Sequence, residues 1–122
     1  MVFQPSQIDI ATATAGLSPA FSRSEVHHAS EWVAKCVSDQ AQLWKHGDLW
    51  AVTEVRLTKT GRIVNIVAIA GEFDNALIGE IEQWAASVGC NKAFFTGRKG
   101  WLRRMRDYRI TTITMVKELE HA

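Results

Sequence analysis

Several residue types are scarce in this chain, and each scarcity excludes a class of protein. The 122 residues include 2 cysteines, 2 prolines and 1 tyrosine. Cys36 and Cys90 lie far apart and lack a metal-ligand spacing, which predicts reduced, buried thiols in a cytoplasmic protein, although one disulfide between them stays open. No apolar run approaches the ~20 residues of a membrane span, and no signal peptide is recognisable at the start. We therefore expect a soluble protein that does not enter a membrane.

Charge is nearly balanced over the whole chain but is concentrated locally. The formal net charge is +1, so the chain is not globally basic. Residues 98–109 contain one acidic residue, Asp107, and six basic ones: Arg98, Lys99, Arg103, Arg104, Arg106 and Arg109. The hydrophobic content of 47% suffices for a single packed core at this length.

The first part of the chain predicts a loosely packed segment followed by a helix. Residues 1–20 are rich in Ala, Thr, Ser, Gln and Pro, which predicts a flexible or extended N-terminal arm with a short strand near residues 8–10. Ser22 and Glu25 have the spacing of a capping box, and apolar residues then recur at helical spacing as far as Trp44. We therefore expect a long amphipathic helix over residues 22–44, within a domain of residues 21–122.

A β-hairpin and a second helix are expected next. Residues 49–58 and 62–70 are two β-rich runs joined by a tight turn, and the second run is apolar enough for a central strand covered on both faces. Asp74 is expected to cap a helix that ends at Gly89. These elements predict an α/β (α+β) domain with a mixed sheet flanked by helices.

The C-terminal third predicts two more strands around a short basic helix. The strands are expected over residues 92–96 and 110–119, the latter because Thr and apolar residues alternate there. The helix is expected over residues 98–107, and its inward side chains are predicted to be Trp101, Leu102 and Met105.

An ordered series of motifs runs through the second half of the chain. The motifs are Ile81-Glu-Gln-Trp-Ala85, Gly89-Cys90, Gly97-Arg-Lys-Gly-Trp101, Asp107-Tyr108 and Lys117-Glu-Leu119. Together with the preceding hairpin, they resemble the C-terminal half of the GNAT acyltransferase superfamily, and most closely the short GNAT-like proteins of tailed phages. The resemblance fades before Gly47. It implies an abbreviated GNAT-like fold, N-acetyltransferase activity and acetyl-CoA as the cofactor.

The resemblance also implies where acetyl-CoA would bind. In that superfamily the cofactor lies between two diverging central strands, and its pyrophosphate binds backbone N–H groups of a glycine-rich loop at the start of the next helix. Backbone groups of Ile69, Ala70 and Gly71 would then align the thioester. The loop over residues 70–76 departs from the pattern, because it lacks the glycines and carries Glu72 and Asp74. These carboxylates oppose a phosphate, and Asp74 is better explained as a helix cap.

The residues expected to act as general base and general acid also differ from the pattern of that superfamily. Glu54 would border the substrate cleft, where it is either a general base acting through water or a solvated cross-strand partner. Many members use a tyrosine on the last helix as the general acid, but Arg103 stands at that position here. Tyr108 is expected to pack as a structural aromatic residue.

The basic segment is a second candidate site. On a helix, Lys99, Arg103 and Arg106 would share one face, with Arg98 beside them. Such a surface can bind the phosphates of a nucleic acid, contact an acidic protein surface, or simply face solvent. All three interpretations stay open.

Two further patterns carry weaker expectations. His27 and Glu31 lie one helical turn apart, but two ligands do not make a metal site, so we expect none. The five tryptophans are predicted mainly as core residues. An interface role stays open for three of them, which lie on the first predicted helix and just past its end: Trp32, Trp44 and Trp50.

The departures favour a non-catalytic or weakly catalytic GNAT-like protein. We expect a binding or structural module with a protein partner or a homo-oligomeric state, as in a phage particle or its assembly. The alternatives are an acetyl-CoA-dependent N-acyltransferase and nucleic-acid binding through residues 98–109. A cytoplasmic location is expected, with the virion as the alternative.

Overall fold

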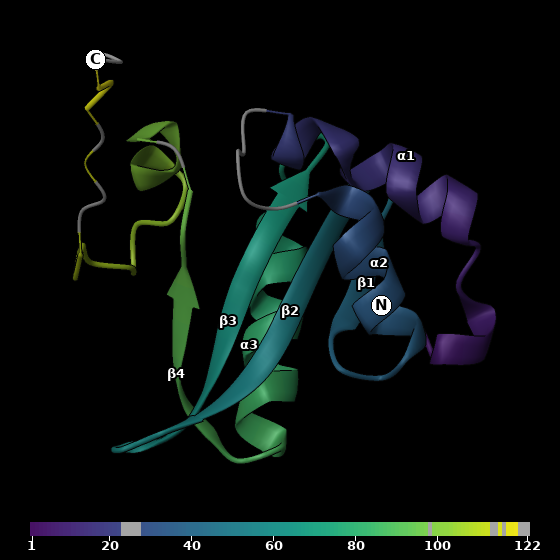
Figure 1. Ribbon diagram of the computed structural model, residues 1–122. Helices are drawn as coiled ribbons and strands as arrows, with labels where there is room; N and C mark the ends of the chain where they lie inside the picture. Colours follow the sequence, from purple (N-terminus) through teal and green to yellow (C-terminus); the bar gives the residue numbers. More distant parts are fainter. Residues whose placement is uncertain (23–27, 98, 113–114, 116, 120–122) are drawn as a thin grey trace.

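A mixed β-sheet organises the chain (Figure 1), and its strands lie in the order β1-β2-β3-β4. The structure is a computed structural model that describes residues 1–22, 28–97, 99–112, 115 and 117–119. Its elements are η1 (Pro5–Gln7), α1 (Ile10–Phe21), α2 (Ala29–Val37), β1 (Gln42–His46), β2 (Leu49–Thr58), β3 (Gly61–Ala70), α3 (Asn75–Ser87), β4 (Cys90–Phe95) and η2 (Lys99–Arg103). β1, β2 and β3 pair antiparallel, whereas β3 and β4 pair parallel. The predicted α/β class with a mixed sheet is confirmed.

Helices cover both faces of the sheet, with α1 and α2 on one side and α3 on the other (Figure 1). On the first face, α1 and α2 pack against side chains of β1, β2 and β3 that include Leu43, Trp50, Val52 and Ala68. On the second face, α3 packs against a set that includes Trp44, Ala51, Ile66 and Ile69. Burial on both faces explains the almost continuous apolar sequence of β3, and β3 is a central strand as predicted.

Residues 10–21 form α1, which corrects the expectation of an extended arm and of a short strand near Ile10. Asp9 caps this helix, since its carboxylate accepts a hydrogen bond from the Thr12 N–H at 3.1 Å. One side of α1 is buried in the core and consists of Ala13, Leu17 and Phe21. The small residues that suggested a flexible arm instead allow close packing, because Gly16 lies directly against the Trp50 ring.

The first residues are also held on the sheet. Val2 forms an isolated bridge with Trp44, and the Phe3 N–H donates to the Leu43 carbonyl at 2.9 Å. This segment therefore extends along the outer edge of β1, which again differs from a free arm.

The predicted helix over residues 22–44 is wrong in its second half. α2 ends at Val37, where the Ser38 N–H donates to the Ala34 carbonyl at 3.1 Å and the Asp39 N–H donates to the Cys36 carbonyl at 3.2 Å. Asp39 then takes a φ of 65°, which a continuing helix does not allow. Residues 42–46 form β1 because they pair with β2 in a hairpin, and this partner outweighs the helical spacing of their apolar side chains. The predicted cap residue Glu25 lies outside the described residues.

The C-terminal segment also differs from its prediction. The described residues between 110 and 119 carry no strand, and the apolar side chains of Ile110, Met115 and Leu119 are 60%, 86% and 79% exposed. Alternating Thr and apolar residues favour a strand only where a partner strand supplies hydrogen bonds, and no such partner is described beside them. The basic helix is shorter than predicted, since η2 ends at Arg103; Met105 is buried as expected, but Leu102 faces outward.

Two predicted elements are confirmed almost residue for residue. β2 and β3 form the hairpin, with Thr58 paired with Gly61 at its turn. α3 is capped by Asp74 and is followed by Gly89 at a φ of 91°, a conformation that suits glycine. The strand predicted at residues 92–96 corresponds to β4.

The cysteines and tryptophans mostly lie where the sequence indicates. Both cysteines are free; Cys36 is buried and Cys90 is partly exposed. Trp32, Trp44 and Trp50 are each at most 9% exposed, which agrees with core packing. Within the described residues, no helix is long and apolar enough to cross a membrane.

Candidate functional site

A gap opens between β3 and β4 at a defined point of the sheet. Their parallel pairing ends at Ile66 and Phe95. On the other side of β3, Val52 pairs with Ala68 and Thr53 pairs with Ile66, so Val67 is an extra residue without a partner on β2. Such a β-bulge bends the strand and increases its twist. We infer that the bulge at Val67 turns β3 away from β4.

The resulting space, which we call the β3–β4 slot, is a cavity of about 210 Å³. Its walls are residues 67–71, residues 95–97, Trp101, and Pro19 and Ala20 of α1. After Ile66, β3 continues to pair with β2, but among the described residues no strand pairs with it on its β4 side, so backbone N–H and C=O groups there lack a described sheet partner. The slot therefore combines apolar walls with the polar edge of a strand.

The structure places Ile69, Ala70 and Gly71 along this slot, as the resemblance implied; their role in binding stays a prediction. Ile69 and Ala70 are held from β2 by pairing with Ala51 and Trp50. Gly71 follows at a φ of 113°, and a Cβ there would lie 2.2 Å from the Asp48 carbonyl oxygen. Glycine is thus required where the chain leaves β3 beside the slot.

An aromatic cluster, formed by Phe73, Phe95 and Trp101, stands at the slot and was not predicted from the sequence. The Trp101 ring contacts both phenylalanine rings edge to face, with centroid distances of 5.4 Å. The Arg104 guanidinium lies over this cluster, 5.5 Å from the Phe73 ring and 5.6 Å from the Trp101 ring. Nothing in the local sequence pattern indicates this meeting, because the three rings come from three separate segments.

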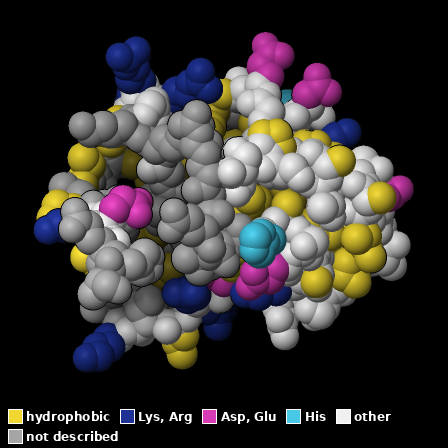
Figure 2. Space-filling model, turned by 45° about the horizontal axis from the view of Figure 1, so that its top comes forward, with side chains coloured by type: hydrophobic (Ala, Val, Ile, Leu, Met, Phe, Trp, Pro, Cys, Tyr) yellow, Lys and Arg dark blue, Asp and Glu magenta, His cyan; other side chains and the backbone are white. Residues whose placement is uncertain are grey.

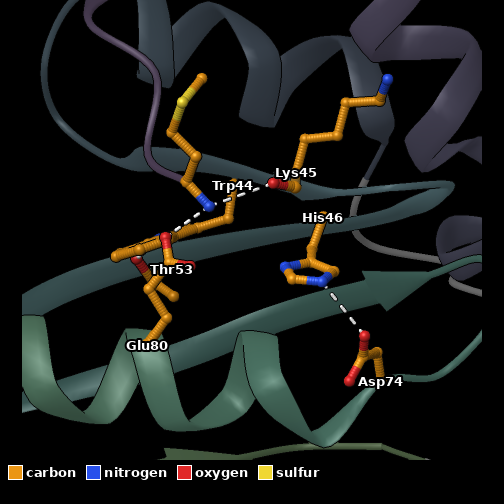
Figure 3. Close-up of polar contacts among 7 residues, drawn as sticks. Trp44, Lys45, His46, Thr53, Asp74 and Glu80 are labelled. Carbon is orange, nitrogen blue, oxygen red and sulfur yellow. Dashed lines mark hydrogen bonds and ion pairs between the residues drawn. The ribbon is translucent and has the colours of Figure 1, made fainter.

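The first turn of α3 is occupied by its own cap (Figure 3). The Asp74 carboxylate accepts a hydrogen bond from the Ala76 N–H at 2.9 Å and lies 3.2 Å from His46 Nε2. The predicted capping role of Asp74 is confirmed. Because one first-turn N–H group is already satisfied and a negative charge lies beside it, this helix end is poorly suited to a second anion.

Glu54 does not line the slot. Its carboxylate accepts a hydrogen bond from Asn65 Nδ2 at 3.2 Å and pairs with Arg56 Nε at 2.8 Å. Asn65 lies two positions before the bulge residue Val67, which corresponds to about 7 Å along the strand. Glu54 is therefore near the slot but already engaged by two partners, and its catalytic role stays a prediction.

The basic segment does not present the helical face that the sequence suggested. η2 ends at Arg103, and Arg106 turns back to donate from Nε to the Arg103 carbonyl at 3.2 Å. Arg98 lies outside the described residues, so the predicted surface of Arg98, Lys99, Arg103 and Arg106 is described only in part. On the face shown in Figure 2, the described Lys and Arg side chains are scattered and do not form one patch.

Tyr108 packs against the α3 core, as predicted, and does not line the slot. Its hydroxyl donates to a Glu82 carboxylate oxygen on α3 at 2.8 Å. Burial raises the pKa of this phenol, and the hydrogen bond and negative charge of Glu82 raise it further. Among the described residues no group of three metal-ligating side chains occurs, and His27 lies outside them.

Known proteins resemble this chain in structure. An aminoglycoside acetyltransferase from an uncultured soil metagenomic sample matches 100% of the chain and 97% of its own length, with a TM-score of 0.66 and 11% identity. The fold is GNAT-like. A ribosomal-protein-alanine N-acetyltransferase from Brucella melitensis (99% and 96% covered, TM-score 0.61, 12% identity) and an acetyltransferase from Trypanosoma brucei (98% and 97%, 0.60, 14%) share it. A comparison with protein-family models gives no match, and neither does one with curated protein sequences.

The GNAT-like fold extends over the whole chain. The match to the soil-metagenome acetyltransferase covers 100% of this chain, including α1 and α2, where the sequence resemblance had faded. At these identities the similarity concerns the backbone arrangement, so the chemistry of the site must be argued from this chain's own residues.

Proposed function

We propose that the β3–β4 slot binds the acyl thioester of a pantetheine arm, as carried by acetyl-CoA, and that the chain is an N-acyltransferase of low activity. The observation that carries this proposal is the bulge at Val67, beyond which the pairing of β3 with β4 ends. A pantetheine arm contains two secondary amides, which need both donors and acceptors. The open edge of β3 supplies these groups in the manner of an added strand.

The slot walls fit the apolar part of such a ligand. Val67, Phe95 and Trp101 supply apolar surface to the slot, and Pro19 and Ala20 of α1 line it as well. A bound acyl thioester supplies an activated carbonyl, at which an amine forms a C–N bond while the C–S bond breaks and the thiol leaves. Backbone groups at positions 67–70 would orient that carbonyl toward the amine.

Proton transfer is the weak point of this site. No described side chain that lines the slot is ionisable, Glu54 is held by Asn65 and Arg56, and the Tyr108 hydroxyl is bound to Glu82. Positioned acids and bases contribute about 10²–10⁴-fold to such reactions. We therefore expect slow transfer that requires an unprotonated amine and that rises with pH.

The same observation supports a second candidate function, a thioester-binding module without transfer. It is the closest to the non-catalytic role that the sequence suggested. A phage-particle role, a protein partner, nucleic-acid binding and a cytoplasmic location stay predictions from the sequence.

Calorimetry with acetyl-CoA tests the proposal. We expect saturable binding to the full chain, loss of binding in Ala20→Phe, which fills the slot from α1, and retention in Ala11→Phe, on the exposed side of the same helix. Release of free thiol with simple amines then separates the two candidates, because a binding module retains affinity without turnover. Absence of binding to the wild-type chain removes both.

A further inference from the structure

We propose that the acyl donor is recognised as a phosphopantetheine thioester, with its single phosphate held by Arg104, and that the adenosine diphosphate part of coenzyme A contributes no affinity. This inference rests on the proposed function and specifies the ligand of the same slot. Its basis is the contrast between a slot that suits the pantetheine arm and a helix end that does not suit a pyrophosphate.

The mismatch lies at the start of α3. A pyrophosphate at a helix N-terminus needs free N–H groups and a positive local field. Here the Ala76 N–H is satisfied by the Asp74 carboxylate, and the Leu77 N–H bonds to the Asp74 carbonyl at 3.2 Å. His46 holds the same carboxylate from β1 at 3.2 Å, so the cap is fixed from two sides (Figure 3).

Negative charge at this position is not limited to Asp74. Glu72 is exposed two residues earlier, in the loop that connects β3 to α3. Two carboxylates beside the helix end would repel the two phosphates of a coenzyme A molecule. A ligand that places no pyrophosphate there avoids this cost.

Arg104 offers a different phosphate contact. Its guanidinium is positioned over Phe73, which directly precedes the cap residue, and over Trp101, which lines the slot. In the part of the chain that the structure describes, no carboxylate lies within ion-pair distance of Arg104. An exposed arginine that is stacked on aromatic rings retains donors for a phosphate, and its fork geometry suits two phosphate oxygens.

This arrangement matches one terminal or linking phosphate at the mouth of the slot. The same chemistry has two sources, a free phosphopantetheine thioester and one attached through its phosphate to a serine of a carrier protein. Both present one phosphate at the end of the pantetheine arm and no adenosine. Exposed Arg103 directly precedes Arg104 and would face an acidic carrier.

Calorimetry of the full chain with three donors tests the inference. Acetyl-phosphopantetheine is expected to bind within about threefold of acetyl-CoA, and acetyl-pantetheine about tenfold more weakly, because it lacks the phosphate contact. An affinity for acetyl-CoA more than about tenfold above that for acetyl-phosphopantetheine would overturn the inference and leave the proposed function standing. No binding of any of the three would remove the proposed function itself.

Variants assign the contacts. Arg104→Gln should weaken the binding of acetyl-phosphopantetheine about tenfold and leave the affinity for acetyl-pantetheine unchanged. Arg109→Gln replaces an exposed arginine farther along the chain and should change neither affinity. Asp74→Asn keeps a good helix cap but removes the negative charge, so it should raise the affinity for acetyl-CoA, and not for the other donors, by at least about threefold. Equal losses in Arg104→Gln for donors with and without phosphate would contradict the assignment.

A carrier arm identifies the source. An acetylated carrier protein is compared with free acetyl-phosphopantetheine by competition for the slot. Competition by either donor at concentrations where acetyl-pantetheine does not compete supports the inference, and the stronger competitor identifies the source of the phosphate. If neither donor competes for the slot at concentrations where acetyl-CoA does, the inference is overturned.

Discussion

Trp44 donates a hydrogen bond from its indole Nε1 to the Thr53 hydroxyl oxygen at 2.9 Å, and both side chains are at most 1% exposed. Thr53 in turn donates to Gln42 Oε1 at 2.9 Å. Thr53 is the first residue of β2 after the register shift, so this buried bond links β1 to the strand segment directly opposite the bulge. The polar contact therefore helps define the point at which β3 turns away from β4.

Thr53→Val tests the energetic value of that bond. The substitution keeps the side-chain volume but leaves the Trp44 N–H without its acceptor, so we expect a loss of about 1–3 kcal/mol in the free energy of unfolding. Urea unfolding measures the loss. A double-mutant cycle with Trp44→Phe should give a coupling energy of about 1 kcal/mol, whereas a coupling near zero would show that the bond is not the cause.

Replacing each of two helix glycines by alanine should change the free energy of unfolding in opposite directions. A Cβ at Gly16 would lie 2.3 Å from Trp50 Nε1, whereas nothing lies within 4 Å of a Cβ at Gly79. Gly79→Ala should therefore stabilise the protein by about 0.5–1 kcal/mol through helix propensity. Gly16→Ala should destabilise it by about 1–3 kcal/mol because Trp50 must move. Thermal unfolding of both variants checks the signs, and stabilisation by Gly16→Ala would contradict the close packing of α1.

Arg62 caps the C-terminal end of α3 from β3. Its Nη1 donates to the Val88 carbonyl at 2.5 Å, where a cation also complements the helix dipole. Arg62→Gln should lower the free energy of unfolding by about 0.5–1 kcal/mol, and added salt should reduce the difference. Arg103→Gln, which removes an exposed arginine from η2, is the matched control and should have no measurable effect.

Cys36 should make stability depend on alkaline pH. Burial in the α1/α2 core raises the pKa of this thiol from its ordinary value of 9.0 to about 12. Above pH 9 the unfolded chain releases this proton and the folded chain retains it, so the folded state loses stability as pH rises from 9 toward 12. At pH 11 the loss attributable to Cys36 should be about 2–3 kcal/mol relative to pH 8.

The control for Cys36 compares slopes between variants. Cys36→Ala should lower stability at neutral pH by leaving a cavity, but its stability should fall less steeply above pH 9 than that of the wild type. Cys90→Ser, at the partly exposed start of β4, should retain most of the wild-type slope. Identical slopes for Cys36→Ala and the wild type would show that Cys36 titrates normally.

Elements governed by short-range signals could be predicted from the sequence. The β2–β3 hairpin has two long β-rich runs and a glycine turn, and α3 has a cap, an apolar face and a terminal glycine, so their local preferences and tertiary roles agree. β1 and the segment after Arg109 show the opposite case. In β1 a partner strand overrides helical spacing, and after Arg109 an alternating pattern has no described partner to pair with.

The candidate site divides in the same way. Asp74 was expected to cap α3, and the likeness to the GNAT superfamily implied Ile69, Ala70 and Gly71, since all four depend on a motif at the end of β3. Arg104, Phe73 and Trp101 were missed as a group because they meet only after the chain has folded. Trp101 and Arg104 are three positions apart, but no local spacing links them to residues 73 and 95.

Composition and local pattern were enough to establish an α/β chain, its hairpin, its central strand and a capped helix. They could not reveal that α1 packs on the sheet, because its small residues become meaningful only beside Trp50. Nor could they place the slot, since a bulge exists only in the register between two strands. The backbone pairing of β2, β3 and β4 decided where β3 has an open edge, and that edge supports the proposed binding function.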